Sequence, residues 1–263
     1  MIKTPPFFSI ITASFNSQKT ISKTIESLLN QDYTDFEYII IDGDSKDETL
    51  KIIKSFEVKF REKNITYKYI SERDNGVYDA WNKGLKLAQG EWISFIGSDD
   101  FYEYNALNLY YNSIRKNLNI NFISSKINII NNKNLIIRTV GEKFNYDNII
   151  RNMNIAQVGA FHKKELFSKI GNFVLEYKIV GDLEFYTRTK NIIIPEYFET
   201  VTANMLNEGL SSLVFQAQNE AKKLKLKRKL LPKYLIYWNF YKSVTIGYLK
   251  KIKSELYIIL NFK

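Results

Sequence analysis

The chain contains no cysteine, and this absence excludes several kinds of site at once. Without thiols there are no disulfides, no thiolate metal centres and no cysteine nucleophiles. Long hydrophobic runs are missing as well, since none approaches the roughly 20 residues that a helix needs to cross a bilayer. The N-terminal MIKTPPFFSI has no apolar stretch followed by small residues, so we expect no signal peptide and a cytoplasmic protein.

Acidic residues are scarce in one segment only. Residues 222–263 hold 12 Lys or Arg and a single acid, Glu255, whereas the rest of the chain is nearly neutral in a protein of formal charge +10. We therefore predict two parts, a folded domain over residues 1–220 and a basic amphipathic helical tail over 221–263. Pro232 divides this tail into two segments.

Aromatic and aliphatic residues alternate with the basic clusters of this tail. That pattern is typical of a peripheral contact with an anionic membrane surface, here the inner face of the cell membrane. Packing of the tail on the domain, an oligomer contact and a general bias toward lysine are the alternatives. Nucleic acid is not an expected partner, because the domain has no basic groove and no signature of a nucleic-acid-binding module.

Four apolar segments of the first hundred residues have the character of buried strands. They end at Ser14, Asp42, Ile70 and Ile96, which are 26 to 28 residues apart, and helical patterns occupy the intervals. This alternation predicts an α/β fold with a mostly parallel sheet flanked by helices. Further along we expect a hairpin over Asn119–Ile137, a helix over Asp182–Thr189 and a short strand over Ile192–Ile194.

Carboxylates gather at the predicted strand ends, where open α/β sheets bind their ligands. Asp99 and Asp100 follow the fourth strand, Asp42 and Asp44 follow the second, and Asp74 follows the third. Adjacent carboxylates suit Mg²⁺ or Mn²⁺, which bind a few carboxylate oxygens together with substrate phosphates. Capping of a following helix is the structural alternative.

Five segments in order resemble family 2 of the inverting nucleotide-sugar glycosyltransferases, which have the GT-A fold. They are SIITASFN (Ser9–Asn16), SLLNQDYTDFEYIIIDGDSKDET (Ser27–Thr49), DNGVYDAWNKGLKLAQGEWISFIGSDD (Asp74–Asp100), FHKKELFSKIGNF (Phe161–Phe173) and VGDLEFYTR (Val180–Arg188). The resemblance implies a Rossmann-like GT-A domain that builds a bacterial surface polysaccharide, a hexosyl- or N-acetylhexosaminyltransferase. Its implied donor is a nucleotide-diphosphate sugar, expected to be a UDP-sugar, and its implied acceptor is a glycan or a polyprenyl-linked sugar.

The resemblance also assigns roles to individual residues. Asp182 would be the general base, and Asp99 with Asp100 would hold Mn²⁺ or Mg²⁺ at the diphosphate. The acceptor or the diphosphate would meet His162, the only histidine, and Ser211 in a glycine turn. The residues expected to bind the donor are Thr12, Ala13, Ser14, Asn16, Asp42, Asp44, Asp74, Asp79, Ser98 and Asp99.

The sequence departs from the family pattern at two glycines. Gly97 stands where many relatives have the first acid of an Asp-x-Asp motif, and Gly43 stands where relatives often have a second acid after the second strand. A degenerate member that binds a sugar nucleotide or a membrane without turnover therefore stays open. A nucleotidyltransferase is a second alternative, disfavoured because the turn after the first strand has no glycine. A P-loop NTPase is excluded because GxxxxGK[ST] is absent.

Overall fold

The first half of the sheet consists of the four apolar segments that the sequence predicts. The computed structural model describes residues 4–207 and 213–261, with 248–261 described by backbone alone. Ser14 pairs with Asp42 and Ala13 with Gly97, so the carboxyl ends of the strands meet at one edge. The four strands are parallel in the order β3-β2-β1-β4, and their bounds are Thr66–Ser71, Phe36–Asp42, Phe8–Ser14 and Trp92–Gly97.

The second half of the sheet is mixed. Beyond β4 the order continues β8-β6-β9-β5, with β7 paired to β6 alone. β8 is antiparallel to both β4 and β6, whereas β9 runs parallel to β6. The bounds are Phe101–Tyr102 for β5, Phe122–Ile130 for β6, Ile136–Val140 for β7, Ala160–Lys163 for β8 and Pro195–Leu206 for β9.

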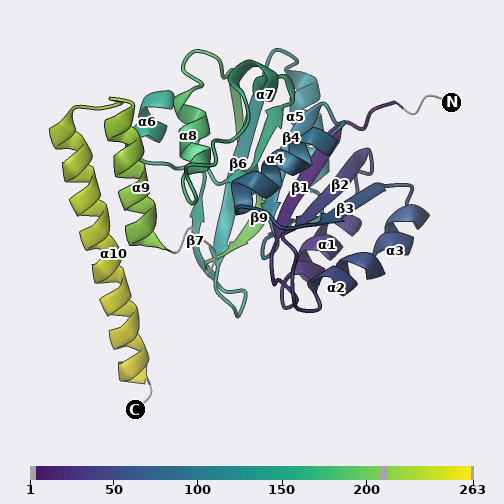
Figure 1. Ribbon diagram of the computed structural model, residues 1–263, viewed down its shortest axis with the longest axis horizontal. Helices are drawn as coiled ribbons and strands as arrows, with labels where there is room; N and C mark the ends of the chain where they lie inside the picture. The colour runs from purple at the N-terminus through teal and green to yellow at the C-terminus, as the bar shows by residue number, and fades with distance from the viewer. Residues whose placement is uncertain (1–3, 208–212, 262–263) are drawn as a thin grey trace.

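Helices cover both faces of the sheet (Figure 1). Successive strand residues enter different cores, since Ile10 packs with the helices of one face and Ile11 with those of the other. The first face carries α1 (Ile21–Leu29), α2 (Thr49–Ser55), α3 (Glu57–Glu62) and α5 (Ala106–Lys116). The second carries α4 (Val77–Leu87), α6 (Tyr146–Arg151), α7 (Glu165–Ile170) and α8 (Gly181–Thr187), and a 3₁₀ turn (Gln157–Gly159) precedes β8. The expected α/β fold is confirmed.

The region after residue 100 follows the predictions in part. The predicted hairpin is confirmed as β6 and β7, and the predicted helix as α8. The strand predicted over Ile192–Ile194 is wrong, because the strand begins at Pro195 and runs to Leu206. A proline is tolerated at the first position of a strand, where its missing N–H breaks no pairing. The sequence of this strand, PEYFETVTANML, contains too many polar residues to form an apolar run, so the sequence pattern did not predict it.

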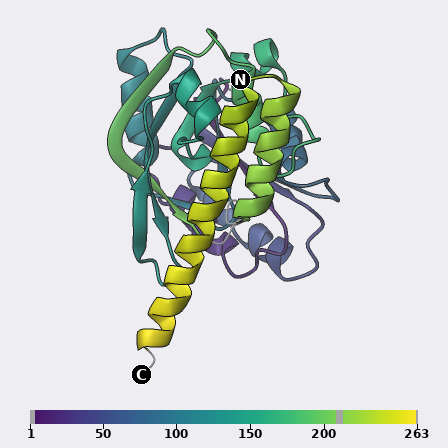
Figure 2. The ribbon, with the colours of Figure 1, turned by 90° about the vertical axis from the view of Figure 1, so that its left-hand side faces the viewer.

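Two helices end the chain, α9 (Val214–Lys227) and α10 (Lys233–Asn261), with Pro232 between them. They run side by side in opposite directions, and α10 extends past the N-terminal end of α9 (Figures 1 and 2). Leu224 of α9 is fully buried in the second core, so α9 packs on the body of the protein. The boundary predicted at residue 220 falls within α9. Within the residues that the structure describes, no helix is both long and apolar enough to span a membrane.

Candidate active site

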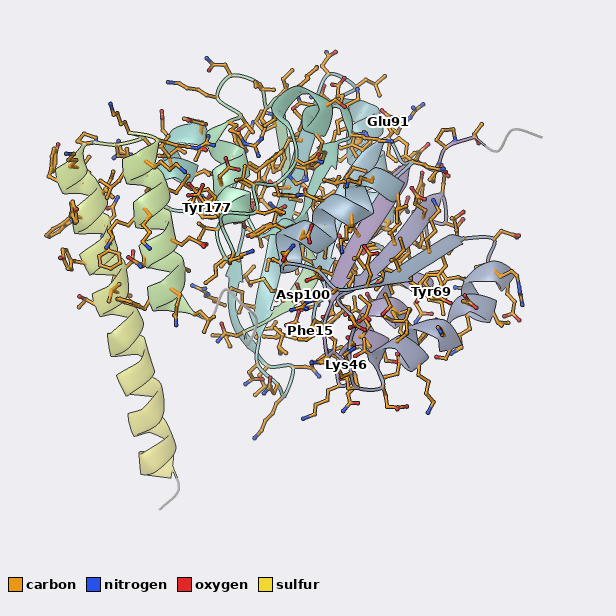
Figure 3. All side chains as sticks on the ribbon, in the orientation of Figure 1. Phe15, Lys46, Tyr69, Glu91, Asp100 and Tyr177 are labelled. Carbon is orange, nitrogen blue, oxygen red and sulfur yellow. The ribbon has the colours of Figure 1, made fainter. Side chains whose placement is uncertain are left out.

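A cavity of about 1260 Å³ lies outside the carboxyl ends of β1 and β4. Figure 3 shows Glu91 and Asp100 at opposite ends of β4, with Phe15 at the same end as Asp100. The cavity thus occupies the place where parallel α/β sheets bind ligands. The predicted site residues that line it are Ala13, Ser14, Asn16, Asp74, Ser98, Asp99, Asp100 and Asp182.

Asp99 and Asp100 converge above Gly97. A methyl group added at Gly97 would lie 2.7 Å from Asp99 Oδ1 and 2.8 Å from Asp100 Oδ2, so both oxygens lie near one point. Asp100 is buried, and its Oδ1 accepts a hydrogen bond from the Leu206 N–H at 3.1 Å. Burial, together with the charge of Asp99, raises the pKa of Asp100 well above its usual range. The missing side chain of Gly97 therefore leaves room for the two carboxylates to approach each other.

Asp182 lies in the first turn of α8 and is half-buried. Its Oδ1 accepts hydrogen bonds from the Leu183 N–H at 2.8 Å and from the Tyr78 hydroxyl at 3.3 Å. Burial raises the pKa of Asp182 to about 6, against these hydrogen bonds, and the charge of Glu220 raises it further. A carboxylate of that pKa is mostly ionised at neutral pH and is a stronger base than an exposed aspartate.

The turn after β1 is tied to the turn after β2. Asn16 adopts a left-handed conformation (φ 48°), its N–H donates to Ser45 Oγ at 2.8 Å, and its Oδ1 accepts from the Lys46 N–H at 2.9 Å. On the other side, the hydroxyls of Ser17 and Ser98 are hydrogen-bonded at 2.8 Å. These bonds fix the loops that form one wall of the cavity.

Asp42 does not reach the cavity. It is fully buried, and its carboxylate accepts hydrogen bonds from the hydroxyls of Ser45 (2.5 Å) and Ser71 (2.6 Å) and from the Ser45 N–H (3.1 Å). Because Ser45 Oγ in turn accepts from the Asn16 N–H, Asp42 supports the turn after β1 through Ser45. Asp44, also absent from the cavity wall, has positive φ (64°) and pairs with Lys46 in an exposed ion pair.

Asp74 lines the cavity because Gly43 leaves it space. A methyl group at Gly43 would lie only 2.7 Å from Asp74 Oδ2. This close approach accounts for a glycine at the position where relatives often have a second acid. Asp74 Oδ1 also accepts from the Gly76 N–H at 2.8 Å. Asp79 is directed elsewhere: its Oδ2 accepts from the Asn75 N–H at 2.9 Å and holds the turn before α4.

The remaining predicted residues lie away from the cavity or cannot be placed. Thr12 is fully buried and shares a hydrogen bond with the Tyr38 hydroxyl. His162 is fully buried in β8, hydrogen-bonded through Nε2 to Tyr186, and burial lowers its pKa to about 3. As a neutral core residue it cannot contact the acceptor, so that expectation is corrected. Ser211 lies outside the described residues.

Comparison with known proteins decides the family. The model of "Glycosyl transferase family 2" matches residues 9–170, more than half of the chain. The chain belongs to glycosyl transferase family 2. A PGL/p-HBAD biosynthesis glycosyltransferase of Mycobacterium bovis is 31% identical to it over 214 residues, 80% of each chain. A UDP-Glc:alpha-D-GlcNAc-diphosphoundecaprenol beta-1,3-glucosyltransferase of Escherichia coli is 35% identical over 148 residues, 56% of each chain. The protein is a glycosyltransferase.

Solved structures agree on the fold of this family 2 glycosyltransferase. TarS of S. aureus in complex with UDP-GlcNAc superposes with a TM-score of 0.66 at 20% identity, over 90% of this chain and 71% of that one. The mannosyltransferase PcManGT of Pyrobaculum calidifontis, in complex with GDP-Man and Mn²⁺, gives 0.65 at 14% identity, over 92% and 74%. At these identities the likeness establishes the GT-A fold.

The charge of the cavity wall bears on metal binding by this glycosyltransferase. Six of its lining residues are acidic and two, Lys19 and Arg138, are basic. The part of the chain that the structure describes has no cluster of three or more His, Cys, Asp or Glu able to hold a metal. The converging pair above Gly97 nevertheless fits Mg²⁺ or Mn²⁺, which binds through one or two carboxylates when phosphates complete its shell.

Sequence reasoning missed several residues of the glycosyltransferase cavity. Phe15 is 61% exposed at its rim, Tyr78 contacts Asp182, and Arg138 and Gln157 lie on the wall formed by β7 and the turn before β8. Tyr78 stood inside a quoted motif, between Asp74 and Asp79. No sequence pattern pointed to Arg138 or Gln157, because only the tertiary structure brings β7 and the turn before β8 to this cavity.

Proposed function

We propose that this glycosyltransferase is an inverting enzyme that moves a sugar from a nucleotide-diphosphate donor, a UDP-sugar, to a hydroxyl of a glycan or lipid-linked acceptor. The observation that carries the proposal is the presence in one cavity of a carboxylate with a pKa of about 6, Asp182, and of the convergent pair Asp99 and Asp100. The E. coli relative is named for a UDP-Glc donor and a diphosphoundecaprenol acceptor, and TarS was solved with UDP-GlcNAc.

In the proposed mechanism Asp182 accepts the proton of the acceptor hydroxyl while that oxygen bonds to the anomeric carbon. The bond from the anomeric carbon to the diphosphate oxygen breaks on the opposite face, and its electron pair leaves with the nucleoside diphosphate. One direct displacement of this kind inverts the anomeric configuration. The Tyr78 hydroxyl, which donates to the Ile179 carbonyl at 2.8 Å and shares its hydrogen with Asp182 Oδ1 at 3.3 Å, helps to orient the carboxylate before the proton moves.

Donor binding is assigned to the loops at the ends of β1, β3 and β4. Ala13, Ser14, Asn16, Ser98 and Asp74 line that side of the cavity. Because acidic residues outnumber basic ones on the wall, an anionic diphosphate needs a counter-charge there. Mn²⁺ or Mg²⁺ held by Asp99 and Asp100 would supply it and would stabilise the leaving diphosphate.

The first experiment measures thermal unfolding with a panel of nucleoside diphosphates, each with and without Mn²⁺. A ligand at 100 times its Kd stabilises the folded state by about 2.7 kcal/mol, a shift that is easily measured. We expect a Mn²⁺-dependent shift with one nucleotide, lost in Asp99→Asn and kept in the matched control Asp44→Asn. Asp44 is an exposed aspartate of a neighbouring strand end that does not line the cavity.

Turnover assays with the sugar nucleotide so identified test the chemistry. Product with an inverted anomeric centre, lost in Asp182→Asn, supports the proposal, and retention of configuration contradicts it. Donor binding without turnover on any acceptor would favour the catalytically degenerate alternative. No shift with any nucleotide in folded protein would refute the donor site.

We also propose a peripheral membrane contact through residues 222–263. On α10, Tyr234, Trp238 and Tyr241 are spaced i, i+4, i+7 and are 72%, 66% and 63% exposed. The opposite face, Ile236 and Phe240, is buried against the rest of the protein. Exposed aromatic side chains among lysines suit an anionic lipid surface.

Vesicle co-sedimentation tests this contact. We expect binding to vesicles that contain anionic lipid, weaker binding to neutral vesicles, and loss of binding in Trp238→Ala/Tyr241→Ala with unchanged thermal stability. Equal sedimentation of wild type and double variant would count against the proposal, and a wild-type dimer that the variant abolishes would indicate an oligomer contact instead.

A further inference from the structure

Glu220 of α9 binds the backbone immediately before Asp182. Its Oε1 accepts a hydrogen bond from the Lys178 N–H at 2.8 Å, and its Oε2 accepts from the N–H groups of Ile179 (2.7 Å) and Val180 (2.9 Å). Three successive amides of a segment without regular structure are thus satisfied by one carboxylate from a distant helix. Hydrogen bonds to a charged acceptor are stronger than neutral ones, so this contact strongly restrains the segment.

The same segment is held on its other side by α4 and the turn before it. The Ile179 carbonyl accepts a hydrogen bond from the Tyr78 hydroxyl at 2.8 Å, and that hydroxyl also lies 3.3 Å from Asp182 Oδ1. Lys178 Nζ donates to the Asn75 carbonyl at 2.8 Å. Glu220 therefore holds the N–H of Ile179, and Tyr78 holds its carbonyl. Ile179 lies two residues before the start of α8, the helix that carries Asp182.

Helix α9 is itself firmly attached to the protein around α8. Leu224 is fully buried, Lys225 Nζ donates to the Arg151 carbonyl at 3.1 Å, and Arg228 pairs with the buried Glu184 of α8. A carboxylate on such a helix has a defined position, so it can define the position of the loop that it binds.

We propose that Glu220 is a positioning residue for the catalytic base: its carboxylate holds residues 178–180 so that Asp182 projects into the cavity in the reactive geometry. The proposal rests on the assignment of Asp182 as base. It makes α9 a support of the active site, although none of the described side chains of this helix lines the cavity. Misplacement of a reacting group by about 1 Å can cost about 100-fold in rate.

The charge of Glu220 adds a second, separable effect. Three titratable groups face Asp182. Glu220 of α9 acts on its pKa through charge, Tyr78 of α4 acts through a hydrogen bond, and Tyr186 of its own helix has its pKa raised by the charge of Asp182. Because the negative charge of Glu220 raises the pKa of Asp182, its removal lowers that pKa. The acid limb of the pH–rate profile then moves to lower pH.

The test compares Glu220→Gln with the matched control Glu176→Gln. Glu176 also links residues 174–180 to α9, but only through an exposed ion pair with Lys227 at 2.7 Å. For Glu220→Gln we expect kcat to fall about 10- to 100-fold, the donor Kd to stay unchanged, and the acid limb to shift to lower pH. Glu176→Gln should match wild type in all three. Equal behaviour of the two variants, or a loss of donor binding in parallel with kcat, would overturn the proposal.

Amide hydrogen exchange tests the contact without any turnover. In wild type the amides of residues 178–180 should be protected, and in Glu220→Ala they should exchange at least about tenfold faster, with α4 protected as before. Unchanged protection at these amides would refute the positioning role whatever the activity. Loss of protection in a protein whose wild type shows no turnover would instead point to failure of the proposed function.

Discussion

The assignment of Asp182 can be tested by its opposite effects on activity and stability. Replacement by asparagine keeps the size of the side chain and an acceptor for the Leu183 N–H but removes the base. A positioned general base contributes about 10²- to 10⁴-fold, so kcat/KM of Asp182→Asn should fall by that factor while donor binding is kept. Asp79→Asn is the control, because Asp79 holds the turn before α4 and does not line the cavity.

The pH dependence of the wild type follows from the same group. With a pKa of about 6 for Asp182, kcat/KM should be nearly constant above pH 7 and should fall about tenfold between pH 7 and pH 5. Tyr78→Phe removes a hydrogen bond to the ionised carboxylate, which raises the pKa and moves the acid limb to higher pH. A flat profile down to pH 5, or activity of Asp182→Asn within tenfold of wild type, would refute the assignment.

Asp182→Asn should lower activity but raise the free energy of unfolding. The pKa of Asp182 is higher in the folded state than its ordinary value of 3.8, so the folded protein binds this proton more tightly and loses stability as pH rises from about 4 to about 6. Asp182→Asn has no charge to bury, so above pH 6 it should be more stable than wild type by up to about 3 kcal/mol. Urea unfolding at pH 8 and at pH 4 measures this, and a stability difference as large at pH 4 as at pH 8 would show that burial of charge is not its cause.

Three further substitutions test other parts of the structure. Gly97→Ala places a methyl group against the carboxylates of Asp99 and Asp100, the proposed metal ligands, and should abolish the Mn²⁺-dependent donor shift in thermal unfolding, with little change in the ligand-free Tm. Gly181→Ala places a methyl group 2.7 Å from the Tyr78 ring and should destabilise by about 1–3 kcal/mol in urea unfolding. Glu184→Gln removes the fully buried charge that pairs with Arg188 and Arg228 and should cost about 3–5 kcal/mol in urea unfolding.

The sequence predicts the parts of the site that follow directly from strand ends. Apolar runs identify β1 and β4, and a parallel sheet brings Asn16, Asp74 and Asp99 to one edge, where the cavity lies. Sequence does not reveal which polar residues of that edge are buried and hydrogen-bonded to neighbouring residues, and therefore do not reach the cavity. Asp42 ends its strand as predicted, but Ser71 reaches it from another strand and it is fully buried.

His162 shows the same limit from the opposite side. A single histidine in a chain of 263 residues draws attention, yet its role depends on what packs around it. Here β6, α7 and α8 surround the ring with Phe122, Phe167 and Tyr186, and burial keeps it neutral. None of these neighbours lies within three residues of His162, so no local pattern could have identified a core histidine.

The C-terminal helices show where composition misleads about boundaries. The change in charge near residue 220 reflects the solvent-facing side of α9, whereas Leu224 and Glu220 make the contacts that join this helix to the protein. A helix can be basic on its exposed face and still supply a carboxylate that binds the segment before the proposed base. Because α10 follows α9 after a short turn and packs beside it, the aromatic face proposed to meet the membrane and the segment before Asp182 are connected through α9. For an enzyme with the proposed lipid-linked acceptor this arrangement has a physical reason, since the proposed membrane contact of α10 would lie next to α9, the helix whose Glu220 holds the backbone before the proposed base.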